Sequence, residues 1–135
     1  MSHSLRYIPV LGRVLMGAPF VLTGLFKLGS YAATVGYIAS VGLPFAPLGW
    51  AIAVAVEIGG GLLLISGYRV RIVALLLALF SLVTAAIFHN HLADQNQLIH
   101  FLKNIMMAGG LLQLVYFGAG PASLDARSVK PALAH

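Results

Sequence analysis

Glu57 lies in the middle of an apolar stretch that carries no other charged residue between Leu48 and Ser66. If this stretch crosses a bilayer, the carboxylate lies near the hydrocarbon midplane, where an unpaired charge costs about 2.5 kcal/mol or more. Ionisable groups at this depth usually face the interior of a helix bundle and pair with one another. Such a carboxylate could take up a proton, and a cation beside it could bind a carbonyl oxygen or a small anion. Glu57 is therefore the first candidate for a functional residue.

The partner of Glu57 should be a cation at similar depth. Superposing Gly60-Gly61 on Gly109-Gly110 places Lys103 three residues closer to the outside than Glu57, or about 4 to 5 Å along a helix. We therefore expect Glu57 to pair with Lys103, or with Arg13 reaching from the cytoplasmic side, and the sequence does not choose between them. An inert buried pair that only fixes helix register is the alternative interpretation.

Other polar residues surround this expected pair. His100 shares a helix face with Lys103, His89 ends an apolar run, and Lys27 is expected to snorkel to the outer interface. The predicted ligand-binding or intramembrane polar cluster is Glu57, Lys103, Arg13, His89, His100, Asn104 and Lys27.

A metal site is not expected in this cluster. His89, His91, Asp94 and His100 lie near one loop, but their spacing matches no firm zinc or haem motif. We expect these histidines to hydrogen-bond a small polar or quinone-like molecule at the outer mouth of the bundle.

Composition makes lipid the expected solvent of this chain. The 135 residues are 60% hydrophobic and 8% charged, whereas soluble domains carry roughly 25% charged residues. The net charge of +5 is scattered, so no nucleic-acid partner is expected. Cysteine is absent, which excludes disulfides, thiolate metal sites and thiol chemistry by this chain.

A membrane-spanning helix needs about 20 mostly apolar residues, and four segments qualify. They are Tyr7–Leu28, Ala46–Ser66, Val70–Phe88 and Leu98–Phe117. The sequence thus predicts an all-α membrane protein with a bundle of four transmembrane helices in one domain, residues 1–120, and a cytoplasmic C-terminal tail, residues 121–135. Apolar residues at helical spacing between the first two spans predict a short interfacial helix. The repeated Gly-Gly-Leu-Leu at positions 60–63 and 109–112 raises the hypothesis of two repeated hairpins.

Positive residues predict the orientation. The side shared by the N-terminus, the second connection and the C-terminus would carry Arg6, Arg69, Arg71, Arg127 and Lys130. The positive-inside rule then puts both termini in the cytoplasm and the two polar loops outside.

Several short motifs occur in an order that resembles a known family. They are Arg13, Gly24-Leu25-Phe26-Lys27, Gly42-Leu43-Pro44, Glu57-Ile58-Gly59-Gly60-Gly61, Phe88-His89, Phe101-Leu102-Lys103-Asn104, Gly109-Gly110, Gly118-Ala119-Gly120-Pro121 and Ser123-Leu124-Asp125. From about Leu5 to Asp125 the chain resembles the DoxX family of small four-helix membrane proteins. The resemblance implies a multi-pass protein of the bacterial plasma (inner) membrane. The family takes its name from a subunit of a thiosulfate:quinone oxidoreductase, so the resemblance also implies quinone-linked redox work.

Three functions follow as hypotheses. The first is a redox-associated subunit that binds a quinone or small anion in a polar intramembrane pocket. Lacking its own redox centre, it would need a redox partner protein or a bound cofactor such as a quinone. The second is a non-enzymatic accessory or assembly subunit, and the third is a small-solute carrier, which would require a homo-oligomer. Whether the chain is itself an enzyme stays open.

Overall fold

The structure is a computed structural model that describes residues 4–128, and every regular element in that range is a helix. The elements are η1 (Leu5–Tyr7), α1 (Ile8–Gly29), α2 (Tyr31–Ser40), α3 (Ala46–Ser66), α4 (Val70–Phe88), α5 (Gln95–Phe117) and α6 (Leu124–Ser128). Four of these segments are long and apolar enough to cross a membrane, namely Leu5–Gly29, Ala46–Ser66, Val70–Phe88 and Gln95–Phe117. The predicted four-helix membrane fold is confirmed, and so is the short helix between the first two spans.

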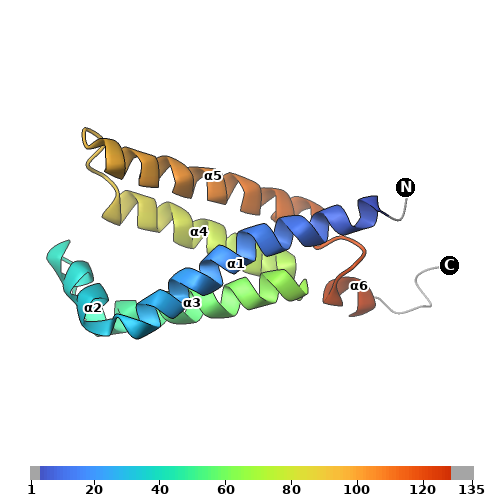
Figure 1. Ribbon diagram of the computed structural model, residues 1–135, viewed down its shortest axis with the longest axis horizontal. Coiled ribbons are helices and arrows are strands. Elements are labelled where there is room, and N and C mark those ends of the chain that lie inside the picture. Colours follow the sequence, from blue (N-terminus) through green and yellow to red (C-terminus); the bar gives the residue numbers. More distant parts are fainter. Residues whose placement is uncertain (1–3, 129–135) are drawn as a thin grey trace.

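The four long helices form two pairs (Figure 1). Helix α1 packs along α3, and α4 packs along α5, while α3 also contacts α4 and joins the pairs. We call the end that carries α2 and the α4–α5 loop the distal end, and the end that carries η1, the α3–α4 turn and α6 the terminal end. In Figure 1 the two pairs diverge toward the distal end and converge toward the terminal end.

Glycines let α1 and α3 approach closely. A Cβ added to Gly17 would lie 2.7 Å from the carbonyl oxygen of Gly61, and a Cβ on Gly61 would lie 2.7 Å from the carbonyl oxygen of Gly17. Seven residues after Gly17 on α1, a Cβ on Gly24 would lie 2.6 Å from a side-chain carbon of Ile58. Small residues give tight helix contacts in lipid, where apolar burial alone drives little association.

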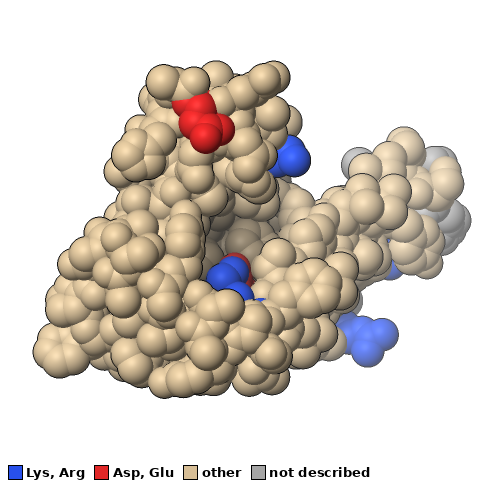
Figure 2. Space-filling model, turned by 60° about the vertical axis from the view of Figure 1, so that its left-hand side comes forward, with Lys and Arg blue, Asp and Glu red and all other residues tan. Residues whose placement is uncertain are grey.

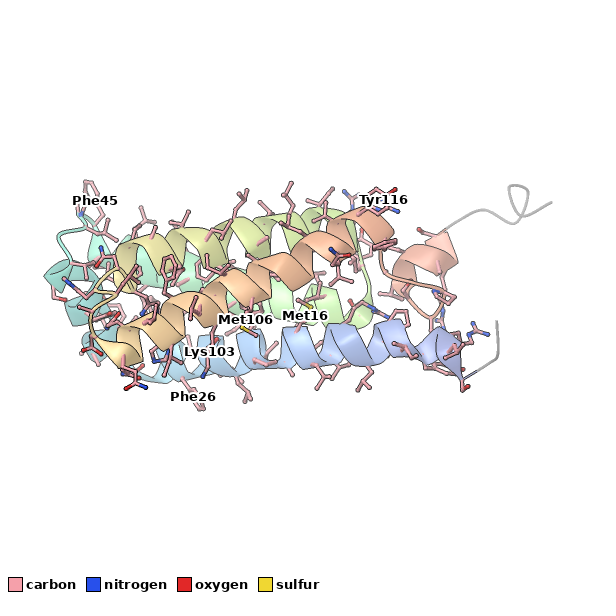
Figure 3. All side chains as sticks on the ribbon, turned by 90° about the horizontal axis from the view of Figure 1, so that it is seen from above. Met16, Phe26, Phe45, Lys103, Met106 and Tyr116 are labelled. Carbon is pink, nitrogen blue, oxygen red and sulfur yellow. The ribbon has the colours of Figure 1, made fainter. Side chains whose placement is uncertain are left out.

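The buried core lies mainly where α3, α4 and α5 meet. It is built from aliphatic residues such as Leu64, Ala74, Leu77 and Leu111, all at most 1% exposed. Large apolar side chains cover the outer faces of the helices, and Figure 3 labels Phe26, Phe45, Met106 and Tyr116 among them. This outward apolar surface is what a bundle surrounded by lipid requires.

The chain after α5 returns to the α3–α4 turn. The carboxylate of Asp125 accepts hydrogen bonds from the backbone N–H groups of Arg69 (2.6 Å), the N-cap residue of α4, and of Val70 (2.9 Å), its first residue. The N–H of Asp125 donates to the carbonyl oxygen of Gly67 at 2.9 Å. Residues 121–128 of the expected tail therefore pack against the membrane domain. Residues 129–135, including Lys130 of the orientation argument, lie outside the described part of the chain.

Candidate functional site

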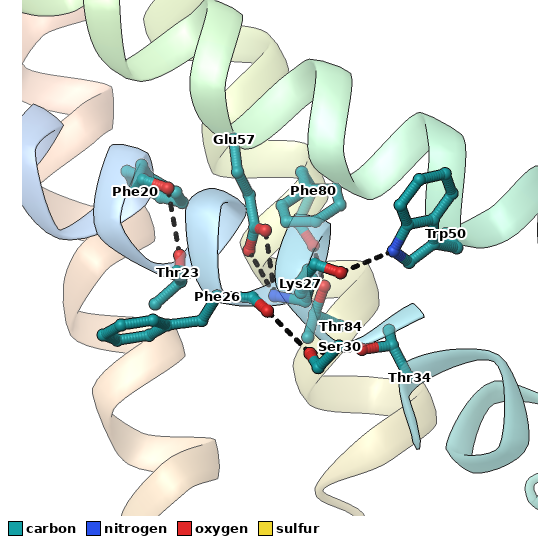
Figure 4. Close-up of polar contacts among 10 residues, drawn as sticks. All are labelled: Phe20, Thr23, Phe26, Lys27, Ser30, Thr34, Trp50, Glu57, Phe80 and Thr84. Atoms are coloured by element: carbon teal, nitrogen blue, oxygen red, sulfur yellow. Dashed lines mark hydrogen bonds and ion pairs between the residues drawn. The ribbon is translucent and has the colours of Figure 1, made fainter. Parts of the chain in front are cut away.

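The partner of Glu57 is Lys27. The Nζ atom of Lys27 lies 2.8 Å from Oε1 and 2.9 Å from Oε2 of Glu57, so one ammonium group bridges both carboxylate oxygens (Figure 4). Glu57 is 5% exposed, whereas 32% of the Lys27 side chain is exposed. The prediction that Lys103 or Arg13 would be the partner was wrong.

Helix neighbours explain this correction. Helix α3 packs mainly against α1, α2 and α4 and makes no extensive contact with α5. The superposition that brought Lys103 of α5 near Glu57 assumed such an extensive contact. Lys103 is exposed and has no ion pair or hydrogen bond within residues 4–128. Arg13 lies fourteen residues before Lys27, about 21 Å away along α1. Lys27 does not snorkel outward because it lies on the α1 face that meets Glu57.

Local hydrogen bonds hold the end of α1 that carries Lys27. The Nε1–H of Trp50 donates to the carbonyl oxygen of Lys27 at 2.7 Å, and the hydroxyl of Ser30 donates to the carbonyl oxygen of Phe26 at 2.6 Å (Figure 4). The carbonyl oxygens of a last helical turn lack the usual helical partners, and that of Lys27 also accepts the backbone N–H of Ser30 at 3.2 Å. Gly24 lies one turn before Lys27, and a Cβ there would lie 3.2 Å from Cβ of Glu57. The Gly24-Leu25-Phe26-Lys27 motif thus combines a close backbone approach with a cation aimed at α3.

The ion pair lies at one side of an apolar cavity of about 480 Å³, which we call the distal pocket. Its walls come from α2, α3 and α4 and include Tyr37, Ile38, Ile52, Ala53, Phe80, Thr84, Phe88 and His89. Figure 2 shows basic and acidic atoms together at the floor of a hollow in this region. Small-molecule sites in proteins commonly have this volume, apolar walls and a few polar groups.

Tyr37 connects α2 to the end of α4. Its hydroxyl donates to the carbonyl oxygen of Phe88 at 3.2 Å, and the two rings stack with centroids 5.5 Å apart. This contact closes the distal pocket on the side of α2. Tyr37 is not among the residues predicted for the polar cluster, and its spacing of four residues from Val41 on the expected interfacial helix was the available signal for it.

Two of the predicted histidines stack at the distal end. His89 lines the distal pocket, its Nδ1 lies 3.1 Å from Oε1 of Gln97, and its ring stacks on that of His100 at 5.0 Å. His100 and Asn104 do not line the pocket, and the side-chain amide of Asn104 donates to the carbonyl oxygen of His100 at 2.9 Å. Of the predicted cluster, the distal pocket brings together Lys27, Glu57 and His89. His100 contacts this group only through its stacking on His89, and Arg13, Lys103 and Asn104 do not line the pocket. Across residues 4–128 no group of three or more His, Cys, Asp or Glu residues is placed to hold a metal ion.

Arg13 belongs to a second polar centre, at the terminal end. Its guanidinium is 1% exposed and donates to the carbonyl oxygens of Ile65 (2.9 Å) and Ala122 (2.6 Å), with a longer contact of 3.4 Å to that of Leu64. Gly67 makes room for it, because a Cβ at that position would overlap the guanidinium. We call Arg13, Gly67, Ser123 and Asp125 the terminal clasp, since they tie α1, the end of α3 and the segment after α5 together.

The fold and the buried ion pair define a class of small polytopic membrane protein with four spans and a polar centre inside the bundle. The family model of DoxX matches residues 8–90. The chain is 35% identical over 116 residues to the inner membrane protein YqjF of Escherichia coli strain K12, covering 86% of this chain and 88% of YqjF. It is 34% identical over 139 residues to the inner membrane protein YphA of the same strain, covering 93% of this chain and 99% of YphA. The chain therefore belongs to the DoxX family. No solved structure matches it significantly.

Proposed function

We propose that this protein is a redox-associated subunit of the bacterial inner membrane that binds the headgroup of a quinone in the distal pocket. One observation carries the proposal: an ammonium–carboxylate pair closes a pocket whose other walls are almost entirely apolar. The ammonium of Lys27 could donate a hydrogen bond to a quinone carbonyl oxygen. The carboxylate of Glu57 beside it could exchange a proton with that oxygen.

The shape and polarity of the pocket support a flat, mostly apolar ligand. Phe80 and Phe88 offer aromatic contacts, and His89 places a second polar group at the pocket wall. A para-quinone has carbonyl oxygens on opposite edges of its ring, so Lys27 could bind one oxygen while His89 binds the other. An apolar tail would remain compatible with the lipid that surrounds the bundle.

Electrons would have to come from elsewhere. Reduction of a quinone to a quinol takes two electrons and two protons, and the cysteine-free sequence offers no thiol to supply electrons. A redox partner protein would deliver them, while Glu57 and His89 would pass protons. Cytoplasmic termini, as the arginines of the terminal end favour, would place the distal pocket on the periplasmic side.

The single tryptophan of the chain permits a direct binding test. Trp50 donates to the backbone of Lys27 and follows Gly49 of the pocket wall, so a bound quinone should quench its fluorescence. Detergent-purified protein would be titrated with a short-chain ubiquinone and a short-chain menaquinone, with Trp50→Phe as the optical blank. We expect saturable quenching that Lys27→Met weakens and Lys103→Met preserves. Linear, non-saturable quenching with both quinones would refute the proposal.

A structural role for the pair is the second candidate, because the bidentate geometry satisfies both oxygens of Glu57 within the protein. In that case the protein would be an accessory or assembly subunit. The double variant Lys27→Met/Glu57→Gln distinguishes the two roles. A well-folded double variant that restores growth or enzyme activity to a deletion strain supports the accessory role, whereas loss of that complementation supports ligand binding.

A further inference from the structure

We propose a second binding site, at the terminal end, for the headgroup of an anionic phospholipid. An open cleft of about 690 Å³ lies where α1 begins, α3 ends and residues 121–127 fold back. We call it the terminal cleft; its lining includes Arg6, Tyr7, Ser66, Ser123, Leu124 and Arg127. The lipid phosphodiester would lie between the guanidinium groups of Arg6 and Arg127. This site is separate from the distal pocket and does not depend on quinone binding.

The charged side chains that line the terminal cleft are basic. Among residues 4–128, two arginines line it and no carboxylate does. The nearby Asp125 lines a neighbouring cleft instead, and both of its carboxylate oxygens accept backbone N–H groups at the start of α4. The positive charge of Arg6 and Arg127 therefore has no acidic residue opposite it within the cleft.

Arg6 also has an unused donor. Its Nε is shielded from solvent and has no hydrogen-bond partner among residues 4–128, and a buried donor left unpaired destabilises the fold. A phosphate oxygen would satisfy it. Guanidinium groups bind phosphate oxygens through paired N–H donors, which gives geometric selectivity as well as charge attraction.

The surroundings favour a lipid over a soluble phosphate. The cleft lies at the start of the apolar span Leu5–Gly29, and the ends of a membrane span lie close to the lipid phosphates. Val10 and Leu124 contribute apolar wall, and the exposed side chains of Leu11 and Leu15 continue along α1, where acyl chains could lie. Basic pockets at such helix ends are suited to anionic headgroups.

The test compares three ligands on the full chain in a neutral detergent. Dihexanoyl phosphatidylglycerol, dihexanoyl phosphatidylcholine and inorganic phosphate would each be titrated, with affinity obtained from the rise in Tm and from native mass spectrometry. We expect phosphatidylglycerol to bind measurably more tightly than the other two. Each of Arg6→Gln and Arg127→Gln should weaken its binding about fivefold, and the double variant about thirtyfold.

The matched control is Arg69→Gln. It removes one positive charge from the same end, but Arg69 lines the neighbouring cleft and its backbone N–H keeps its contact with Asp125, so affinity should stay near that of the unmodified protein. The charge-conserving Arg6→Lys/Arg127→Lys variant should keep only part of the affinity, because it retains the charge but not the paired N–H donors, and it covers the case in which the glutamine variants fail to fold. Equal binding of phosphatidylcholine would overturn the proposal. So would equal binding of inorganic phosphate, equal losses in Arg69→Gln, or unchanged affinity in the folded double glutamine variant.

Discussion

The two ends of the bundle bury charge in different ways. At the terminal end, Arg13 is enclosed by backbone carbonyl oxygens from two other segments and lies against Gly67 with no space left over. At the distal end, Lys27 neutralises Glu57 but remains about one-third exposed, beside a cavity of about 480 Å³. Both sites contain an ionisable residue on α1 that reaches α3, but Lys27 and Glu57 line the distal pocket, whereas Arg13 itself lines none of the clefts described above.

This difference separates a structural charge from a candidate functional one. A buried ionisable group inside a membrane span is a functional candidate by default, and by that criterion Arg13 and Glu57 rank equally. The two groups differ in the accessible volume beside them, and by this measure Glu57 is the better functional candidate. Both terminal nitrogens of the Arg13 guanidinium donate to backbone carbonyl oxygens of the fold, and only its Nε has no partner among residues 4–128. The Lys27–Glu57 pair, in contrast, has a face that a ligand could reach.

The largest expected effect is on stability at the terminal clasp. Arg13→Met leaves the carbonyl oxygens of Ile65 and Ala122 without their donor, and loss of hydrogen bonds to a buried charged group should lower the free energy of unfolding by about 3 kcal/mol or more. Arg13→Lys should recover only part of this loss, because one ammonium replaces a forked guanidinium. Thermal unfolding in detergent measures both. A wild-type Tm for Arg13→Met would show that the clasp does not stabilise the fold.

A smaller effect on stability, with a larger one on binding, is expected at the distal pocket. Lys27→Met leaves the nearly buried carboxylate of Glu57 without a cation and should lower the free energy of unfolding by about 1 to 3 kcal/mol. Adding Glu57→Gln to Lys27→Met should restore much of that stability because no charge is then unpaired. Quinone quenching of Trp50 should stay lost in this double variant. Recovery of quenching together with stability would mean that the pair does not contact the ligand.

A third and smaller effect on stability is expected at the start of α4. Asp125→Asn removes the negative charge that accepts the N–H groups of Arg69 and Val70, and should cost about 1 kcal/mol, as for other helix N-terminal caps. Chemical unfolding monitored by circular dichroism would measure the loss. The distal pocket lies on the other end of α4, so quinone affinity should not change. A change in quinone affinity would show that the two ends are coupled through α4.

The spans were predictable because apolar length depends on residue type alone. The expected Ala46–Ser66 and Val70–Phe88 coincide with α3 and α4. Helix α5 begins at Gln95 rather than Leu98, because the carboxylate of Asp94 accepts the N–H groups of Asn96 and Gln97 and so caps a polar first turn. Hydropathy does not detect such a turn, although Asp94 at its start was a visible signal for a cap.

The ion pair was only half predictable. The sequence gives the depth of each charge, and it correctly singled out Glu57 as buried. Which charges pair also depends on which helices are neighbours and on how each helix is rotated about its own axis. Neither can be derived from how deep a charge lies in its span. Lys103 became a candidate through a glycine repeat shared with α3, beside Arg13, and the sequence did not choose between them. The actual partner comes from α1, which packs on α3 through Gly17 and Gly24 of α1 and Gly61 of α3. The site of Arg13 depends on the chain after α5, which no hydrophobic pattern describes.

The smallest expected effect is that of Lys103→Met. This variant tests whether an exposed lysine without a partner among residues 4–128 matters as much as Lys27 does. Lys103 and Lys27 both lie within apolar spans, but Lys103 has no ion pair or hydrogen bond in the described part of the chain. Its removal should change the free energy of unfolding by no more than about 0.5 kcal/mol and leave quinone quenching intact. Unfolding and fluorescence titration of the same sample would measure both quantities. If Lys103→Met instead weakened the quinone as much as Lys27→Met, α5 would have to close onto the distal pocket when ligand binds, and the diverging helix pairs would be the open state of a moving bundle.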